Sequence, residues 1–368
     1  MKTIFTFLGM LLFTAVLAQD KIFVHTATTE NISADATFID HPDLNGNPSA
    51  GILEVHNFSP LGVYNDRATG LFYSSTQNKW TIYNEDSSPM VENSSYNVYI
   101  GDPSNFITHI ATVGNQGSFG GYTTVIDDPD FNGSDPGPYA VFSTYYNPNS
   151  ERNDNQFGFY YDTALDKRGI YEEGTTTIPD GAAFKILKTG GTGTNRTTHV
   201  ASAANTSGHI TTIDHPDLNG NPDGAFVFSH YWGVNGPDTQ VSLDANLSVW
   251  YNGSNWTIYC EDTTVAIPEN LAFDIIIADR EVLGVEENQL VAASVTMFPN
   301  PTSGVVTFDS KEVISNIGIY NILGQEVKQI SGKNSNNLTI DISGLAAGNY
   351  IAKVQAGTAV ESVKLIKL

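Results

Sequence analysis

A polar ten-residue stretch that occurs three times carries the clearest chemistry in this sequence. Its first copy, from Ile39 to Pro48, reads IDHPDLNGNP. Carboxylate and amide oxygens at alternating positions around a glycine turn are the ligands that a hard cation such as Ca²⁺ prefers. The candidate calcium ligands are Asp40, Asp43, Asn45 and Asn47 in the first copy, Asp127, Asp130, Asn132 and Asp135 in the second, and Asp214, Asp217, Asn219 and Asn221 in the third.

The same stretch also has a purely structural interpretation. Pro-Asp and Asn-Gly dipeptides form tight turns without a metal, through Asx hydrogen bonds and a positive φ at glycine. The EF-hand pattern is not satisfied, because the bidentate glutamate at the twelfth loop position is missing. The sequence therefore leaves a Ca²⁺ loop and an unaided turn as alternatives.

Histidines form a second candidate constellation. The six are His25, His41 and His56 near the N-terminus and His199, His215 and His230 further along, with separations of 16 and 15 residues in both sets. Imidazoles from three strands can meet around Zn²⁺ or Cu²⁺. The stretch between the two sets keeps His109 but has Asp128 and Thr144 at the other two positions. This departure weakens the transition-metal hypothesis, and a histidine bonded to a turn carbonyl is the alternative.

Other catalytic groupings find little support. The sequence has no Gly-x-Ser-x-Gly elbow and no P-loop, and its one cysteine, Cys260, aligns with Asn84 and Glu172 in the other copies. We therefore interpret Cys260 as a packing residue. Acidic pairs recur after a Trp/Ile strand, at Glu85-Asp86, Glu172-Glu173 and Glu261-Asp262. Because adjacent residues on a strand point to opposite faces, we interpret these pairs as turn carboxylates and not as a glycosidase pair.

The polar stretch also fixes the domain organisation. Asp40, Asp127 and Asp214 are 87 residues apart, and a period of this length is a whole small domain. The repeats span residues 21–101, 106–189 and 197–279, and residues 280–295 form a linker.

Each repeat reads as a set of short strands separated by turn clusters. Phe226 to Trp232 alternates with a period of two, and Lys79 to Tyr83 places Trp and Ile on one face. No amphipathic helical window interrupts the strands. We therefore predict an all-β protein of three tandem small antiparallel β-sandwich or barrel repeats, folded independently of one another, with a closed ring as the less favoured arrangement.

Composition and the N-terminus point to export. The formal net charge of −23 disfavours binding to nucleic acid or to an anionic membrane. Residues 1–18 combine an early lysine, a short apolar run and small residues before the cut, as in a secretory signal peptide. No later stretch is apolar for long enough to predict a transmembrane segment.

The C-terminal region is a different module. It contains four ordered blocks, Phe298–Gly304, Ile319–Val327, Leu338–Tyr350 and Val363–Leu368, whose Pro and Gly turns and short alternating strands predict another β-sandwich. Residues 296–368 closely resemble the type IX secretion system C-terminal sorting domain (type A) of Bacteroidota. The resemblance implies contact with the type IX secretion machinery, passage across the outer membrane and attachment to the cell surface. Residues 21–279 in turn resemble an uncharacterised β-repeat domain of secreted Bacteroidota proteins, which implies no activity.

Repetition favours binding over catalysis. Three similar weak sites multiply affinity, whereas enzymes seldom need three copies of one small domain. Exposed aromatics, notably Tyr64, Tyr73, Tyr231 and Trp232, can stack on sugar rings. We therefore predict a non-catalytic, surface-displayed adhesion protein with a glycan or matrix ligand. A metal-dependent extracellular hydrolase and a calcium-stiffened structural spacer are the alternatives.

Overall fold

The protein consists of two compact units, residues 1–282 and residues 283–368. The computed structural model describes residues 20–133, 139–147, 149–188, 194–233, 236–281, 295–321, 325–356 and 359–368. The expected signal peptide, most of the linker and Asp135 lie outside these residues. Within them, strands are joined by turns and three short 3-10 segments, and no helix has the length and apolarity needed to cross a membrane.

Each repeat contributes seven strands to the first unit. Repeat 1 contains β1 (Lys21–Thr26), β2 (Ile32–Ser33), β3 (Ala36–Phe38), β4 (Gly51–His56), β5 (Thr69–Ser74), β6 (Lys79–Asn84) and β7 (Ser95–Gly101). Repeat 2 contains β8 (Phe106–Ile110), β9 (Gln116–Gly117), β10 (Gly120–Val125), β11 (Val141–Tyr145), β12 (Phe157–Asp162), β13 (Lys167–Glu172) and β14 (Ala183–Leu187). Repeat 3 contains β15 (Thr194–Val200), β16 (Thr206–Ser207), β17 (Ile210–Thr212), β18 (Phe226–Tyr231), β19 (Leu247–Tyr251), β20 (Trp256–Cys260) and β21 (Ala272–Glu281). The all-β prediction is confirmed.

Within a repeat the pairing is antiparallel and follows the same plan each time. In each repeat the strand with period-two alternation (β4, β11 or β18) pairs with the last strand of the repeat (β7, β14 or β21). We call these two the alternating strand and the closing strand. The aromatic strand pairs with the Trp/Ile strand, as β5 with β6, β12 with β13 and β19 with β20. Residues opposite each other in these ladders define equivalent positions in the three repeats.

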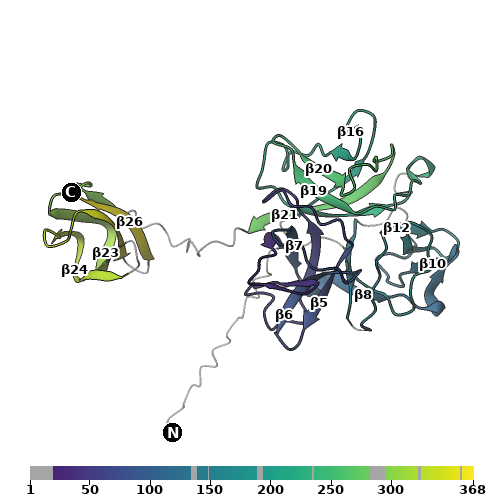
Figure 1. Ribbon diagram of the computed structural model, residues 1–368, viewed down its shortest axis with the longest axis horizontal. Coiled ribbons are helices and arrows are strands. Elements are labelled where there is room, and N and C mark those ends of the chain that lie inside the picture. Colours follow the sequence, from purple (N-terminus) through teal and green to yellow (C-terminus); the bar gives the residue numbers. More distant parts are fainter. Residues whose placement is uncertain are drawn as a thin grey trace, which may run out of the picture. The chain divides into compact units, whose positions relative to one another are not determined.

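The repeats are joined edge to edge by parallel pairs. The aromatic strand of one repeat pairs with the alternating strand of the next, as β5 with β11 and β12 with β18. The same contact between repeats 3 and 1 is a parallel bridge from Val249 to Asn57, and β1 also pairs in parallel with β21. The expectation of independently folded repeats is therefore wrong. Each repeat has open strand edges, and these pair with its neighbours in a closed ring of three (Figure 1).

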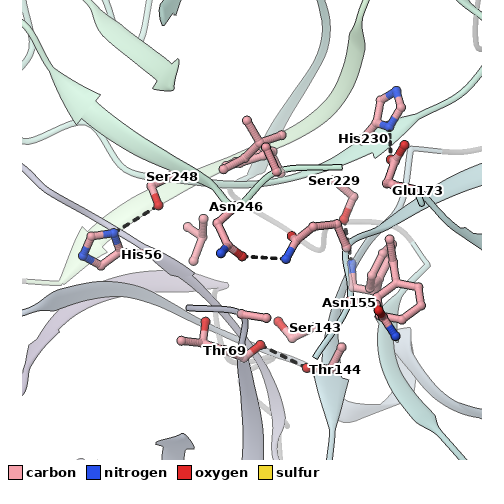
Figure 2. A pocket seen from close by; sticks show the side chains of 18 of the residues that line it. His56, Thr69, Ser143, Thr144, Asn155, Glu173, Ser229, His230, Asn246 and Ser248 are labelled. Carbon is pink, nitrogen blue, oxygen red and sulfur yellow. Dashed lines mark hydrogen bonds and ion pairs between the residues drawn. The ribbon is translucent and has the colours of Figure 1, made fainter. Parts of the chain in front are cut away.

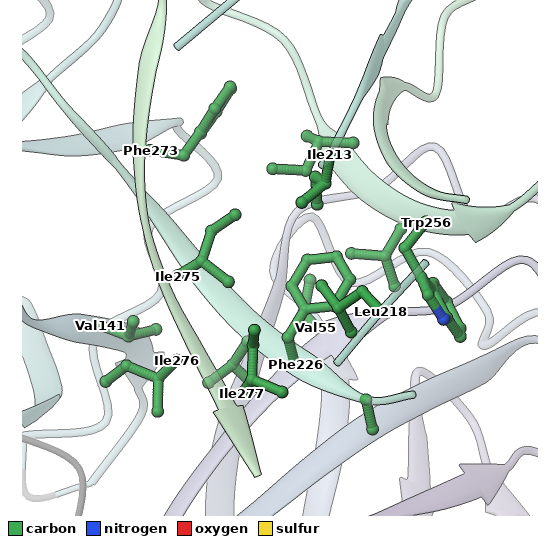
Figure 3. Close-up of a cluster of buried hydrophobic side chains, with 14 of the residues drawn as sticks. Val55, Val141, Ile213, Leu218, Phe226, Trp256, Phe273, Ile275, Ile276 and Ile277 are labelled. Carbon is green, nitrogen blue, oxygen red and sulfur yellow. The ribbon is translucent and has the colours of Figure 1, made fainter. Parts of the chain in front are cut away.

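The apolar cores of the repeats also merge. The largest buried cluster is centred on Phe226, Ile276 and Trp256 of repeat 3, and it includes Val55 of repeat 1 and Val141 of repeat 2 (Figure 3). Apolar side chains from all three repeats thus leave water together, which adds to the stability of the ring. We call the contacts between repeats 1 and 2, 2 and 3, and 3 and 1 the first, second and third interface.

The second unit is a five-stranded antiparallel β domain with its own core. Its strands are β22 (Thr296–Phe298), β23 (Val305–Asn321), β24 (Glu326–Asp341), β25 (Gly348–Ala356) and β26 (Ala359–Lys367). In β25 buried and exposed residues alternate, so one face packs against the core. The core contains Phe308, Ile317, Ile319 and Val354.

Candidate functional site

Each interface buries a glutamate that directly follows the Trp/Ile strand. Glu85, Glu173 and Glu261 are only 3%, 7% and 6% exposed. A tyrosine two residues earlier donates its hydroxyl to each carboxylate, over 2.7 Å from Tyr83, 2.7 Å from Tyr171 and 2.9 Å from Tyr259. The interpretation of these three glutamates as turn carboxylates is wrong, because the neighbouring repeat covers them.

The next repeat supplies a polar partner to each glutamate. His230 and His56 hold Nδ1 against the carboxylates of Glu173 and Glu261, and Thr144 takes the same place at Glu85. Each glutamate lies so close to the aromatic strand that this strand needs a small residue beside the carboxylate. A Cβ at Gly70 would lie 2.6 Å from Glu85 Oε1, and one at Gly158 would lie 2.8 Å from Glu173 Oε1.

The third interface has a serine at the position of these glycines. Ser248 Oγ lies 3.0 Å from His56 Nδ1 and also donates to the carboxylate of Glu261. In a nucleophilic triad the serine and the acid contact opposite ring nitrogens of the histidine. Here both contact Nδ1, so the group links the repeats and does not have the triad arrangement.

The tyrosine that bonds each buried glutamate belongs to a set of three aromatic side chains. The sets are Phe72, Tyr83 and Tyr146 at the first interface, Tyr160, Tyr171 and Trp232 at the second, and Trp250, Tyr259 and Phe58 at the third. The contacting rings of each set have centroids between 5.7 and 6.4 Å apart, and most of these pairs pack edge to face. In each set one ring comes from the following repeat.

The residue five positions before the aromatic strand decides whether the set is covered. We call this the plug position, and it holds Tyr64, Arg152 and Ser242 in repeats 1, 2 and 3. Arg152 covers the first interface, with its guanidinium carbon 4.9 Å from the ring centroid of Tyr83. Tyr64 covers the third, with its ring 4.5 Å from Phe58 and 6.0 Å from Tyr259. Ser242 is too short to cover the second.

The second interface consequently has an open pocket of about 150 Å³. Its lining residues are Phe119, Tyr122, Thr123, Tyr160, Tyr171, Glu173, Thr175, Trp232 and Ser242. Of the four aromatics singled out from the sequence, Trp232 lies in this pocket, Tyr64 is a plug and Tyr231 is buried. Tyr73 packs edge-to-face on Trp80.

A longer hairpin in repeat 2 adds a wall to the pocket. The equivalent His–Thr hydrogen bonds span 12 residues in repeats 1 and 3 but 15 in repeat 2, from His109 to Thr124. The extra residues carry Phe119, which is 52% exposed and whose ring lies 5.8 Å from Tyr160 and 6.5 Å from Trp232. Asp162 anchors the hairpin by accepting hydrogen bonds from the amide and the hydroxyl of Ser118.

A second cavity, of about 140 Å³, lies where the three repeats meet. His56 and Ser248 lie on one side of it, and Glu173 and His230 on the other (Figure 2). Gln156 Nε2 donates to Asn246 Oδ1 over 2.5 Å, which links repeats 2 and 3 beside the cavity. Burial raises the pKa of Glu54, which also lines it, to about 7. The cavity is small and polar, and several of its lining residues bond one another, although the buried Glu54 Oε2, His56 Nε2 and His230 Nε2 have no hydrogen-bond partner among the described residues.

The candidate calcium ligands lie in turns where other side chains bind them. Asp40 accepts a hydrogen bond from Asn45 Nδ2 over 2.7 Å and pairs with Lys79. The equivalent bonds run from Asn132 to Asp127 over 3.1 Å and from Asn219 to Asp214 over 2.6 Å. Asp43 pairs with Lys21, Asp130 with Lys188 and Asp217 with Asn195, while Asn47 and Asn221 donate to backbone carbonyls. These contacts account for the turn without a cation.

The histidines of a repeat point to different places. His25 and His199 bond Thr37 and Thr211 over 2.8 and 2.7 Å, and burial lowers the pKa of each imidazole to about 4. His41 stacks on Phe23 and bonds Glu281, His215 lies 3.8 Å from Asp217, and His56 and His230 lie at interfaces. Among the described residues no group of three His, Cys, Asp or Glu could hold a metal ion, so the structure does not assemble the predicted histidine sites.

Comparison with known families identifies both parts of the chain. Residues 12–100, 70–164 and 158–277 match the family described as Domain of unknown function (DUF7452). Residues 296–368 match the family described as Secretion system C-terminal sorting domain, which confirms the resemblance of the tail. A search of curated proteins gives no match to this chain.

Proposed function

We propose that this protein, which belongs to the DUF7452 family and ends in a type IX sorting domain, is a non-catalytic binding protein that engages its ligand at the second interface. The sorting domain directs export through the type IX system to the cell surface or outer membrane. A protein displayed at that surface can act in adhesion. Its ligand lies outside the cell, so the binding pocket must be exposed.

One observation carries the proposal. Three interfaces share a buried glutamate and an aromatic set, but the plug position holds a large side chain at two of them and Ser242 at the other. A pocket lined by aromatic rings and a few polar groups is the usual form of a site for a small ligand or for a side chain of a larger one. Burying the rings of Trp232 and Phe119 would then provide most of the binding free energy.

The experiment fills the pocket. The purified chain is screened on glycan and extracellular-matrix arrays, and hits are repeated with Ser242→Tyr, which copies the plug of repeat 1 at the second interface. A matched control is Ser254→Tyr, on an exposed turn of the same repeat. We expect binding to be lost with the first variant and kept with the second. A ligand that both variants bind equally would refute this placement of the site, and the absence of any ligand would refute a binding function.

A further inference from the structure

The side chain that fills the first interface indicates what the open pocket accepts. The guanidinium of Arg152 lies 4.9 Å from the ring centroid of Tyr83 and 5.7 Å from that of Tyr146. Its Nη2 contacts Asp35 Oδ2 over 2.5 Å, and its Nη1 donates to the carbonyl of Asn84 over 2.7 Å. A planar cation between aromatic faces, with an acid beside it, is a favourable cation–π arrangement.

The second interface keeps the walls of this arrangement and strengthens them. Tyr171 and Trp232 stand at the positions of Tyr83 and Tyr146. Indole has the most favourable face for a cation among the aromatic side chains. Phe119 adds a ring that has no counterpart at the first interface, so the pocket is enclosed by aromatic groups on more sides than the place where Arg152 lies.

The charges around the pocket favour a cation as well. Glu173 lines it, and Glu172 lies close enough to both Glu173 and Asp244 for their charges to interact. At the first interface the counterparts of Glu172 and Asp244 are Asn84 and Asp154, and the cations Arg152 and Arg67 lie near them. Among the described residues, Glu172 and Asp244 have no lysine or arginine within ion-pair distance.

The third interface offers the contrasting case. Tyr64 fills it with a neutral ring, and Cys260 stands where the second interface has Glu172. Because the first interface has Asn84 there, the second interface alone has an acid at this position. The second interface combines the aromatic walls with acids at Glu172 and Glu173, an arrangement that favours an organic cation.

Building on the proposed function, we propose that the pocket of the second interface binds the guanidinium group of an arginine side chain presented by an extracellular protein. The guanidinium takes the place that Arg152 takes at the first interface, between Tyr171 and Trp232. Tyr122 stands at the position of Asp35, so the negative charge comes instead from Glu173, which lines the pocket, and from the adjacent Glu172. Because the site reads one side chain, the free energy of contact is modest, and attachment of whole cells through many copies of the displayed protein raises the avidity.

The test compares a cation with a neutral molecule of the same shape. The probes are N-acetyl-arginine amide, N-acetyl-citrulline amide and methyl glucoside, titrated into the full chain and followed by ligand-observed NMR and calorimetry. We expect the arginine probe to bind at least about tenfold more tightly than the citrulline probe, since the cation–π attraction and the carboxylates act only on the cation. Trp232→Leu and Ser242→Arg should each remove this binding, and Ser254→Tyr should leave it unchanged.

The outcomes separate this inference from the proposed function. Equal binding of the arginine and citrulline probes, or preferential binding of methyl glucoside, would refute a cation site. If an array ligand is lost with Ser242→Tyr but the arginine probe does not bind, the proposed function stands and this inference is wrong. If neither an array ligand nor the probe binds, both are wrong.

Discussion

The first and second interfaces have the same architecture, but an equivalent buried position carries opposite charges in the two. At the first, Lys185 of repeat 2 lies with Nζ 5.2 Å from the ring of Trp80 and 5.4 Å from that of Tyr145. At the second, the position of Trp80 holds Arg168, and the position of Lys185 holds Asp274, whose Oδ2 lies 3.4 Å from Arg168 Nη2. Where the tryptophan is replaced by a cation, the facing residue is an acid.

The same two interfaces differ at the plug position, and there the change is not compensated. Arg152 fills the first interface and Ser242 leaves the second open. When a buried residue changes together with the residue that faces it, the two repeats stay paired. Such changes affect the stability of the ring and the order in which the repeats pair. A change that leaves a pocket exposed to solvent instead affects ligand binding. This contrast separates the structural interface residues from the proposed binding residues.

The largest expected effect comes from breaking the buried ion pair. Arg168 is 1% exposed, and Arg168→Ala leaves the Asp274 carboxylate in the core without its cation, which costs about 3–5 kcal/mol. Lys185→Met at the first interface keeps the apolar contacts and should cost less than about 1.5 kcal/mol. All four tryptophans, Trp80, Trp232, Trp250 and Trp256, belong to the first unit, so urea unfolding followed by tryptophan fluorescence reports on it alone.

A double variant controls for the change of volume. The third interface pairs Trp256 with Asn97 at these positions, so Arg168→Trp with Asp274→Asn gives the second interface the same combination. It should recover most of the lost stability. If Arg168→Ala costs no more than Lys185→Met, the two interfaces are not distinguished by their buried charges.

The two interfaces should also respond to pH in different ranges. Burial raises the pKa of Asp274 to about 6, although Arg168 opposes the shift, and burial lowers the pKa of Lys185 to about 8. Between pH 4 and 6 the folded state binds more protons at Asp274 than the unfolded state does, so this group makes stability fall as pH rises. Between pH 8 and 10 the unfolded state binds more protons at Lys185, so stability rises with pH. Each slope approaches about 1.4 kcal/mol per pH unit.

Difference curves isolate these two groups from the many other titrating residues. Subtracting the unfolding free energy of Asp274→Asn from that of the wild type should give a slope only in the acidic range, and Lys185→Met should give one only in the alkaline range. Flat difference curves would show that neither group has a different pKa in the folded and the unfolded state.

The strands could be predicted from the sequence, but the strands of other repeats that pair with them could not. Period-two alternation at Phe226–Tyr231 marks β18 as half-buried, and it does not reveal that β12 of another repeat completes that sheet through two residue pairs. The interpretation of Glu173 as a turn carboxylate fails for this reason, because the groups that bond it, His230 and Leu243, lie 57 and 70 residues away.

Part of the candidate site was nevertheless accessible from the repeats. The alignment that equates Cys260 with Asn84 and Glu172 also equates Glu85, Glu173 and Glu261, whose neighbours are Tyr83, Tyr171 and Tyr259. The longer spacing from His109 to Thr124 marks the extended hairpin of repeat 2. The plug position is harder to find, because the number of residues between His230 and Leu247 exceeds that between His56 and Thr69, and only the strand ladders restore the register.

Removing the plug of the first interface should make it resemble the second. Arg152→Ser deletes the cation–π contacts and the ion pair with Asp35, at a cost of about 1–2 kcal/mol. It opens a second aromatic pocket, so the arginine probe should bind with a stoichiometry of two instead of one, measured by calorimetry. Arg280→Ser is the matched control, since Arg280 pairs with Asp223 and belongs to none of the aromatic sets. A stoichiometry that stays at one would mean that an aromatic set without its plug is not sufficient for binding.

The smallest effect on stability is expected at the hairpin that only the second interface has. Phe119 is half-exposed, so Phe119→Ala should change the unfolding free energy by less than about 0.5 kcal/mol. The ring nevertheless forms one wall of the pocket, and its loss should weaken binding of the arginine probe by roughly threefold, in keeping with about 0.5–1 kcal/mol for an exposed cation–π contact. Val113→Ala, at another exposed apolar residue of repeat 2, should change neither quantity. If Phe119→Ala destabilises the protein strongly while probe binding is unchanged, the hairpin supports the fold and is not part of the site. The two interfaces would then differ in their binding properties through the plug position alone.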